Sequence, residues 1–311
     1  MPPVVAVDLG GTNIRAAFYS DGEPPATNST SRPTSAADGA QAVLDHIHAA
    51  IEALSIPASA RAHLAIAIGA PGPVDQARAV VLHAPNLPGW KNISLGDIMQ
   101  EHWRCQVFVE NDANMAVLGE WQYGSGRGAH HIVMLTIGTG IGGGVIVADR
   151  LLRGAHGLAT ELGHLPVQLD GPLCSCGQPG HLEALASGTA IARRVQEQGG
   201  LAQPSAAGEA TTEEIAAAAR AGDPVAVYVL RAAAHALGTG LAGLVHTFNP
   251  ELIILGGGVA RAGGFFLQEV EAVLRSSLMD GAFAEGLELK PSTLGDQAAL
   301  LGGLALVKTS S

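Results

Sequence analysis

The segment VDLGGTN at residues 7–13 places a carboxylate, two glycines and a hydroxyl close together. The carboxylate of Asp8 follows an apolar run, as expected for a residue at the end of a strand. Glycines directly after it let backbone N–H groups approach an anion. The lysine of the GxxxxGK[ST] phosphate loop is absent, so the segment is not a loop of that class. It predicts a site for a phosphate and its metal ion, formed by Asp8, Gly10, Gly11, Thr12 and Asn13.

Two later segments repeat this use of glycine. Residues 136–144 read TIGTGIGGG and residues 255–259 read LGGGV. A single glycine turn is common in ordinary hairpins, so either segment alone is a weak signal. Three such segments in one chain favour phosphate binding through backbone groups. We therefore expect nucleotide contacts at Gly138, Thr139, Gly140, Gly256 and Gly257.

The segment ENDAN at residues 110–114 places polar side chains at the boundary between two predicted elements. It follows a short apolar run, Val107–Val109, and precedes a stretch of helical composition. A carboxylate at this boundary can act as a general base, and Asn111 can bond a hydroxylated ligand. The alternative is that Asp112 simply caps the following helix. The residues alone leave both interpretations open.

Composition narrows the classes of partner. The chain has 311 residues, of which 47% are hydrophobic, so it can bury a large core. Its 17 Lys and Arg against 28 Asp and Glu give a net charge of −11, without a long run of either sign. Nucleic acid and an acidic membrane surface are therefore not expected as partners. An anionic ligand would be held by backbone N–H groups, helix N-termini and a divalent metal ion.

The beginning of the sequence, MPPVVAVDLGG, has no basic stretch, long apolar region or cleavage site, and the chain contains three cysteines. These features predict a cytoplasmic protein without a disulfide framework. The longest window without a charged residue or a histidine, Ile132–Ala148, is interrupted by several glycines. It predicts two buried strands joined by a turn rather than a membrane span.

The order of the predicted elements indicates an α/β protein with mixed sheets. A strand, a glycine turn and a second strand open the chain, and the same pattern returns near residue 139, as in a duplicated unit. A glycine-interrupted helix at Leu294–Val307 is expected to return to the first lobe. At about 150 residues per domain, the length predicts two lobes with a cleft between them. We expect a small lobe, residues 1–111 plus 295–311, and a larger lobe, residues 112–294.

The glycine segments, ENDAN and the stretch ELGHLPVQLDGPLCSCGQPGHLE at residues 161–183 together resemble the ROK family (repressor, open reading frame, kinase). The resemblance covers nearly the whole chain. It implies a two-lobed actin-like ATPase fold, related to ribonuclease H, with duplicated mixed-sheet domains. The segments APGPVD and APNLPGW are similar to the sugar-facing loops of ROK glucokinases. The implied reaction is therefore transfer of the γ-phosphoryl group of ATP to the 6-hydroxyl of glucose.

The resemblance also implies roles for individual residues. Asp112 matches the general base that accepts the proton of the attacking sugar hydroxyl, which favours the catalytic interpretation of ENDAN. Asp8 is implied to reach Mg²⁺ through water. Besides Asp112, the positions that match the family's sugar-binding residues and their supporting loops are Gly72, Asn86, Asn111, Glu161, His164 and Glu183.

A structural zinc ion in the loop at residues 163–183 is a further implication of the resemblance. The family supplies one histidine and three cysteines, but here His181 stands where the third cysteine is expected, beside His164, Cys174 and Cys176. Because imidazole is also a good zinc ligand, we predict a site of two thiolates and two imidazoles. The alternative is that the thiols are free and that zinc is lost.

Several alternatives stay open. Similar polar residues could serve N-acetylmannosamine, N-acetylglucosamine, fructose or allose, and backbone phosphate loops could accept donors other than ATP. The family also includes sugar-responsive repressors, which carry a helix-turn-helix segment before the first glycine loop. No basic helix precedes Asp8 here, so a kinase is expected rather than a regulator. A homodimer is expected from the family alone.

Overall fold

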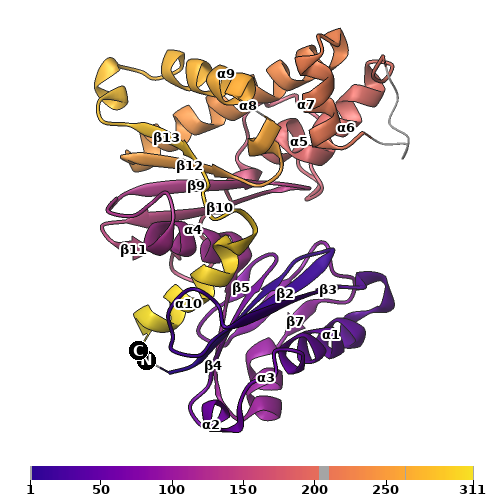
Figure 1. Ribbon diagram of the computed structural model, residues 1–311. Coiled ribbons are helices and arrows are strands. Elements are labelled where there is room, and N and C mark those ends of the chain that lie inside the picture. Colours follow the sequence, from indigo (N-terminus) through magenta and orange to yellow (C-terminus); the bar gives the residue numbers. More distant parts are fainter. Residues whose placement is uncertain (1, 203–209, 263, 311) are drawn as a thin grey trace. The chain divides into compact units, whose positions relative to one another are not determined.

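The computed structural model of the chain describes residues 2–202, 210–262 and 264–310 (Figure 1). It divides into two compact units. Unit 1 comprises Met1–Gly128, Leu151–Thr160 and Thr293–Ser311. Unit 2 comprises Ala129–Arg150 and Glu161–Ser292.

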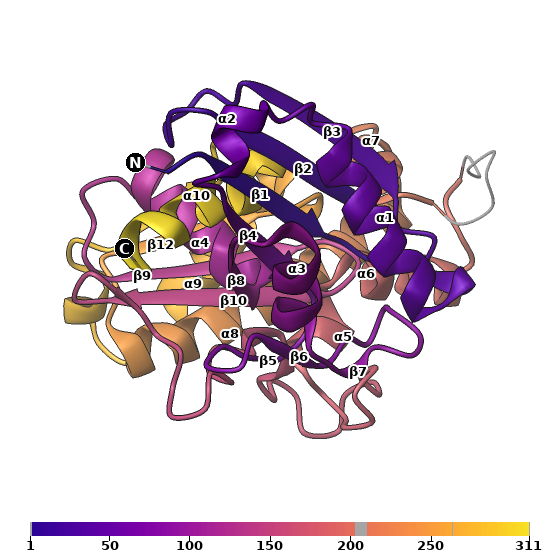
Figure 2. The ribbon, with the colours of Figure 1, turned by 90° about the horizontal axis from the view of Figure 1, so that it is seen from below.

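A five-stranded sheet forms the centre of unit 1, with the order β3-β2-β1-β4-β8 (Figure 2). The predicted hairpin around the first glycine segment is confirmed, because β1 pairs antiparallel with β2. On its other side β1 pairs parallel with β4, which in turn pairs parallel with β8. The bounds are β1 (Val4–Leu9), β2 (Asn13–Tyr19), β3 (Asn28–Pro33), β4 (Ala65–Ala70) and β8 (Gln106–Asn111).

Helices cover both faces of this sheet, as its buried parallel strands require. Val5 and Val7 of β1 share a core with α1 and α3, while Ala6, which points to the opposite face, lies against Gly303 of α10. Helix α4 packs on α10 on that second face. The bounds are α1 (Ala40–Glu52), α3 (Leu95–Trp103), α4 (Asp112–Tyr123) and α10 (Ala298–Ser310).

The unit boundaries differ from those expected from the sequence. Helix α4 belongs to unit 1 rather than to a lobe beginning at residue 112, and so does the segment 151–160. The physical reason for α4 is its close approach to α10. A Cβ atom on Gly119 would lie 2.0 Å from the carbonyl oxygen of Ala298, and one on Gly302 would lie 1.7 Å from that of Met115. As expected, the C-terminal helix returns to unit 1.

Smaller elements complete unit 1. A three-stranded antiparallel sheet, which the sequence pattern did not indicate, joins three short strands in the order β5-β6-β7. Its strands are too short for a clear alternation of polar and apolar residues. The bounds are η1 (Ala36–Asp38), α2 (Ala58–Arg61), β5 (Val74–Asp75), β6 (Val80–His83), β7 (Lys91–Ile93) and η5 (Gly295–Gln297).

Unit 2 repeats the plan of unit 1, with the sheet order β11-β10-β9-β12-β13. An antiparallel hairpin, β9 with β10, is again followed by parallel pairing of β9 with β12 and of β12 with β13. The matching strand orders support the duplication expected from the two glycine hairpins. The bounds are β9 (Ile132–Ile137), β10 (Ile141–Val147), β11 (Arg150–Leu151), β12 (Leu252–Gly256) and β13 (Glu288–Pro291).

The helices of unit 2 pack around α8, which contacts α5, α6, α7 and α9. The chain from Leu182 to Glu197 forms two helices, because the Ser187 hydroxyl accepts a hydrogen bond from the Ala190 N–H and begins a new helix. The bounds are η2 (Leu162–His164), α5 (Leu182–Ala186), α6 (Gly188–Glu197), α7 (Thr212–Arg220), α8 (Pro224–Phe248), η3 (Val259–Ala262), α9 (Gly264–Ser276) and η4 (Gly281–Ala284).

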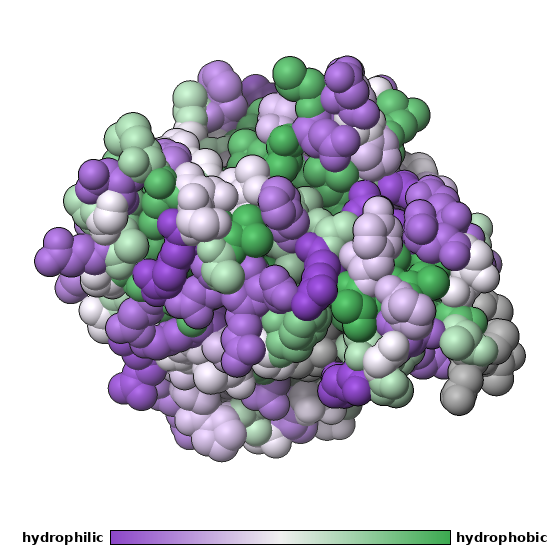
Figure 3. Space-filling view, turned by 90° about the horizontal axis from the view of Figure 1, so that it is seen from above, coloured by the Kyte–Doolittle hydropathy of each residue, from purple (hydrophilic) through white to green (hydrophobic). Residues whose placement is uncertain are grey.

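Helix α8 is the one helix of the described residues that is long and apolar enough to cross a membrane by length and composition. However, 56% of its apolar window is buried within the protein, and its neighbours are other helices of unit 2. This burial is that of the core helix of a globular unit. The face of the molecule in Figure 3 carries hydrophilic and hydrophobic side chains interspersed.

Candidate active site and metal centre

The first glycine segment forms the turn between β1 and β2 in unit 1. The Gly10 N–H donates to the carbonyl oxygen of Asn13 at 3.0 Å, which closes the turn. Thr34, which is fully buried, holds the turn from outside. Its hydroxyl donates to the Gly10 carbonyl oxygen at 2.6 Å, and its N–H donates to the Thr12 carbonyl oxygen at 2.8 Å. Sequence reasoning missed Thr34, because nothing in its polar neighbourhood marks it as buried.

Asp8 lies opposite Arg15 in the β1–β2 hairpin, and their side chains form an ion pair of 3.3 Å. The same guanidinium reaches Asp296 at 3.3 Å. Burial raises the pKa of Asp8, the charge and hydrogen bond of Arg15 lower that pKa, and the charge of Asp296 raises it. The hairpin register could have identified Arg15 from the sequence, because residues that face each other across a hairpin make side-chain pairs.

The parallel strands of unit 1 bring several predicted residues to one edge of the sheet. In the strand register Asp8 pairs with Gly69, and the next residue of β4, Ala70, pairs with Asn111. The loop after β4 holds Gly72, which has a φ of +80°. A Cβ atom at this position would lie 2.1 Å from the His83 carbonyl oxygen, so the loop requires glycine here. Carboxyl ends of parallel strands are where ligands bind in open α/β sheets.

The junction between β8 and α4 is held by Asn111. Its Oδ1 atom accepts hydrogen bonds from the N–H groups of Ala113 and Asn114, both at 3.0 Å, so Asn111 is the N-cap of α4. Its Nδ2 atom donates to the Gly72 carbonyl oxygen at 3.1 Å. Asp112 is the first helical residue, and its Oδ1 atom accepts from the Ala113 N–H at 2.8 Å. The sequence left open whether Asp112 caps the helix. In the structure the N-cap is Asn111 instead.

Asn86, also a predicted sugar-loop residue, lies against the first glycine turn. A Cβ atom on Gly11 would be 3.2 Å from the Cβ atom of Asn86. Unit 1 thus brings together the first glycine segment, the Gly72 loop, Asn86 and the β8–α4 junction. The other predicted site residues belong to unit 2.

The second glycine segment forms the turn between β9 and β10 in unit 2. The Gly138 N–H donates to the Gly140 carbonyl oxygen at 2.9 Å. The first residues of α6 hydrogen-bond to this turn. The Gly188 N–H donates to the Gly138 carbonyl oxygen at 2.8 Å, and the Thr189 hydroxyl donates to the Thr139 carbonyl oxygen at 2.7 Å. These hydrogen bonds within the protein hold the backbone of the turn in place.

The third glycine segment ends β12, the strand next to β9. Gly256 pairs with Thr136 in the parallel register, and a Cβ atom on Gly257 would lie 2.3 Å from the Ile137 carbonyl oxygen. Two of the predicted nucleotide segments are thus adjacent at the carboxyl ends of neighbouring strands of unit 2. Backbone groups in such turns can hold phosphate without a basic side chain.

Glu183 contacts both the second glycine segment and the cysteine loop, the turns that carry Cys174, Ser175 and Cys176. One carboxylate oxygen, Oε2, accepts from the Ile141 N–H at 2.9 Å. The other, Oε1, accepts from the Ser175 hydroxyl at 2.9 Å and lies 3.7 Å from the Cys174 sulfur. Ser175 was not singled out by the sequence analysis, because a serine between two cysteines carries no signal of its own.

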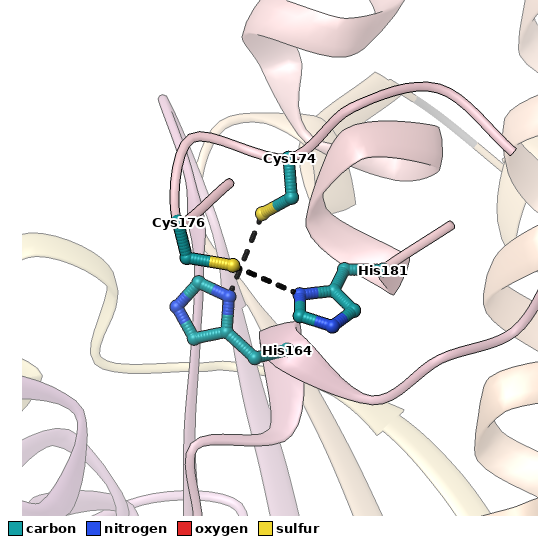
Figure 4. Close-up of side chains that lie close together, drawn as sticks. All are labelled: His164, Cys174, Cys176 and His181. Atoms are coloured by element: carbon teal, nitrogen blue, oxygen red, sulfur yellow. Dashed lines mark hydrogen bonds between the residues drawn. The ribbon is translucent and has the colours of Figure 1, made fainter. Parts of the chain in front are cut away.

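The four predicted zinc ligands lie together in unit 2 (Figure 4). Their ligand atoms are all within 4.8 Å of one another. The Cys174 sulfur is 3.5 Å from His164 Nδ1, and the Cys176 sulfur is 3.2 Å from His181 Nδ1. The sequence places His164 in η2, the cysteines in the following turns and His181 directly before α5. Burial raises the pKa of the Cys174 thiol when no metal is bound.

These donors fit a zinc ion. Bonds of about 2.3 Å to sulfur and about 2.0 Å to nitrogen in a tetrahedron put neighbouring ligand atoms about 3.6 Å apart. The two sulfur–nitrogen separations, 3.5 Å and 3.2 Å, are close to that value. Two thiolates and two imidazoles are also a donor set that zinc prefers. The four side chains therefore form a cluster whose composition and size suit zinc.

Comparison with known proteins extends these observations. The model of the ROK family matches residues 4–310. The chain is 37% identical over 312 residues to a glucokinase of Thermotoga maritima, and the match covers 98% of this chain and 97% of that protein. It is 34% identical over 257 residues to the xylose repressor of Caldicellulosiruptor bescii, spanning 81% of this chain and 64% of that protein.

Among solved structures, a ROK family glucokinase from Streptomyces griseus in complex with glucose and AMPPNP is similar, with a TM-score of 0.83 and 35% identity. The similarity covers 99% of both chains. Together with the duplicated mixed sheets, it confirms the two-domain actin-like ATPase fold expected from the sequence.

Proposed function

This chain belongs to the ROK family, and from that premise we propose that it transfers the γ-phosphoryl group of ATP to the 6-hydroxyl of glucose. It is a sugar kinase, a phosphotransferase of the glucokinase type. The observation that carries the proposal is the full-length match to a glucokinase, at 37% identity over 98% of this chain. The acceptor hydroxyl and the roles of individual residues below are part of the proposal.

Asp112 is proposed as the general base. Its place at the first turn of α4, at the carboxyl end of a parallel strand, supports this role. The carboxylate takes the proton of the sugar hydroxyl while the hydroxyl oxygen bonds to the γ-phosphorus. The bond between that phosphorus and the β–γ bridging oxygen breaks, and ADP leaves with the electron pair.

The hexose hydroxyls are proposed to be bound by Asn111, Asp112, Glu161, His164 and Glu183, the residues that match the family's sugar-binding positions. Carboxylate, amide and imidazole groups suit a neutral polyol, because each makes directed hydrogen bonds. An epimer that leaves one such group unpaired loses about 1–3 kcal/mol of binding free energy. Gly72 and Asn86 support this site from their loops.

The nucleotide is proposed to be held by the three glycine segments. The hydrogen-bonded turns of the first two segments and the net charge of −11 support binding through backbone N–H groups rather than through basic side chains. Asp8 is the residue proposed to hold Mg²⁺, through water. When bound, Mg²⁺ neutralises charge that develops on the phosphate oxygens.

The zinc ion is proposed to be structural and to be held by His164, Cys174, Cys176 and His181. The loop between His164 and His181 has few buried side chains and is closed by two isolated bridges, one of which joins Pro166 to His181. A metal ion supplies folding free energy to such a loop. The proposal further includes a cytoplasmic homodimer.

The test is ADP release from ATP and Mg²⁺ across a panel of glucose, fructose, allose, N-acetylglucosamine and N-acetylmannosamine. We expect a strong signal with glucose above a no-sugar control, and none with 6-deoxyglucose, which lacks the acceptor hydroxyl. Oxidation of the product by a dehydrogenase specific for glucose 6-phosphate checks the position of transfer. A better acceptor than glucose would revise the substrate, and equal ADP release without sugar would contradict a sugar kinase.

A second candidate, a sugar-responsive regulator, is favoured by the 34% identity to a xylose repressor. This function requires sugar binding without phosphoryl transfer. Calorimetric binding of a sugar by folded chain, combined with no sugar-dependent ADP release, would support it over the kinase.

A further inference from the structure

Glu110 is a buried carboxylate close in sequence to Asp112, the proposed base. The proposed reaction assigns no role to Glu110. Its side chain is 2% exposed, and its Oε2 atom is 2.7 Å from the Nε atom of Arg153, whose side chain is 29% exposed. A charge removed from water at this depth requires a partner of opposite charge and further hydrogen bonds. Arg153 supplies that charge from a distant part of the sequence.

The second oxygen of Glu110 holds the backbone on which Asp112 is built. Oε1 accepts from the Asn111 N–H at 3.0 Å and from the Asn114 Nδ2 atom at 3.0 Å. Asn111 and Asn114 lie on either side of Asp112. The carboxylate therefore binds the last residue of β8 and the first turn of α4 at once, and it restrains the residue between them.

Arg153 lies in the segment 151–160, which packs with unit 1 although the residues on both sides of it belong to unit 2. Besides the bond from Arg153 to Glu110, this segment is bonded to Asn114, whose side chain donates to Glu110. The Thr160 hydroxyl lies 3.2 Å from the Oδ1 atom of Asn114, as a donor to it. Thr160 has a φ of +72°, a left-handed conformation that β-branched residues rarely adopt. Both ends of the segment thus contact the Glu110 and Asn114 side chains.

We propose that Glu110 and Arg153 are positioning residues for Asp112: their buried ion pair holds the β8–α4 junction in the geometry required for phosphoryl transfer. This inference rests on the proposed function, in which Asp112 is the base. Without Arg153, the Glu110 carboxylate is left buried and uncompensated, so it turns toward water. The Asn111 N–H then loses its acceptor, and the Asp112 carboxylate loses its fixed direction.

The variant Arg153→Met tests the pair. Because misplacement of a reacting group by about 1 Å costs up to about 10²-fold in rate, we expect kcat to fall by at least about 10-fold. The KM for ATP should change by less than about twofold, since the hydrogen bonds of Glu110 join it to Arg153, Asn111 and Asn114 rather than to a residue proposed to bind the nucleotide. Arg275→Met is the matched control, because it removes an exposed Arg–Glu pair on α9.

Two double variants separate positioning from a general loss of stability. In Glu110→Gln/Arg153→Met the amide oxygen still accepts from Asn111 and Asn114, and no charge is buried, so kcat should return to within about threefold of the wild type. In an Asp112→Asn background, Arg153→Met should lower the residual turnover no further, because the base that it positions is already gone.

Hydrogen exchange gives a readout that does not depend on activity. The amide of Asn111 should exchange faster in Arg153→Met than in Arg275→Met or in the wild type. If Arg153→Met does not fold, Arg153→Lys, which keeps the charge but not the planar donor group, should show a smaller fall in kcat with unchanged KM for ATP.

The two proposals fail in different ways. A wild-type chain that turns over no sugar contradicts the proposed function. Normal wild-type turnover together with unchanged kcat and unchanged Asn111 exchange in Arg153→Met overturns the positioning role alone. An equal fall in kcat with and without Asp112 also overturns it, because the effect would then not act through the base.

Discussion

The Oε2 atom of Glu183 accepts a hydrogen bond from the backbone N–H of Ile141 at 2.9 Å. Its other oxygen accepts from the hydroxyl of Ser175, between the two clustered cysteines. One carboxylate therefore ties the cysteine loop to the glycine turn between β9 and β10. Gly140 leaves the space for this contact, because a Cβ atom there would lie 2.4 Å from Oε2.

Gly140→Ala should therefore displace the Glu183 carboxylate and leave the buried Ile141 N–H without an acceptor. We expect the free energy of unfolding to fall by about 1–3 kcal/mol, measured by urea denaturation. Gly138→Ala is the control, since no atom lies within 4 Å of its Cβ position. Equal stabilities of the two variants would show that Glu183 does not restrain the turn.

Asp112→Asn should lower kcat by a factor of at least about 10², because the amide cannot accept the proton of the sugar hydroxyl. Glucose should still bind, as measured by calorimetry. Asp97→Asn is a matched control, since Asp97 is also an acidic residue in the first turn of a helix, α3, and it is exposed. Wild-type turnover in Asp112→Asn would refute the assignment of the base.

The two charges near Asp8 should shift its titration in opposite directions. Arg15 lowers the pKa of Asp8, so Arg15→Gln should raise that pKa, and the carboxylate should lose its charge at a higher pH. Asp296 raises the pKa of Asp8, so Asp296→Asn should lower it. If Asp8 must be charged to hold Mg²⁺, the acid limb of kcat/KM for ATP moves to higher pH in the first variant and to lower pH in the second. Shifts in the same direction would contradict this role.

The same pKa has a consequence for stability. Burial holds the pKa of Asp8 above its ordinary value of 3.8, so the folded chain binds the proton more tightly than the unfolded chain does. The contribution of Asp8 to stability is therefore greatest at a pH below 3.8 and is lost as the pH rises through the folded pKa. Arg15→Gln should make this loss larger, which denaturation at several pH values measures.

Purified chain should contain close to one zinc ion per molecule, measured by mass spectrometry of the metal. His181→Ala should lower this content, whereas His181→Cys should keep it, because a thiolate can replace the imidazole. Cys105→Ala should have no effect, since Cys105 lies outside the cluster. Chelation should lower the unfolding temperature. Zinc-free chain with unchanged unfolding would contradict a structural ion.

Local patterns in the sequence were sufficient to predict the elements that carry the site. The glycine turns interrupt apolar runs, and ENDAN follows directly on one, so the β1–β2 hairpin, the β9–β10 hairpin and the β8–α4 junction could be located from neighbouring residues alone. The match of His164, Cys174, Cys176 and His181 to the zinc ligands of the ROK family likewise predicted a cluster that the fold assembles. These features depend on contacts between residues fewer than about 20 positions apart in the sequence.

Tertiary structure alone decided which distant segments support these elements. Helix α4 joins unit 1 because α10, from the other end of the chain, packs closely on it at Gly119 and Gly302. Arg153 meets Glu110 across 43 residues of sequence. Thr34 meets Gly10 across 24. Such pairs depend on the long-range packing of the chain. The periodicity of one segment predicts only whether a face is buried, not which distant segment packs against it.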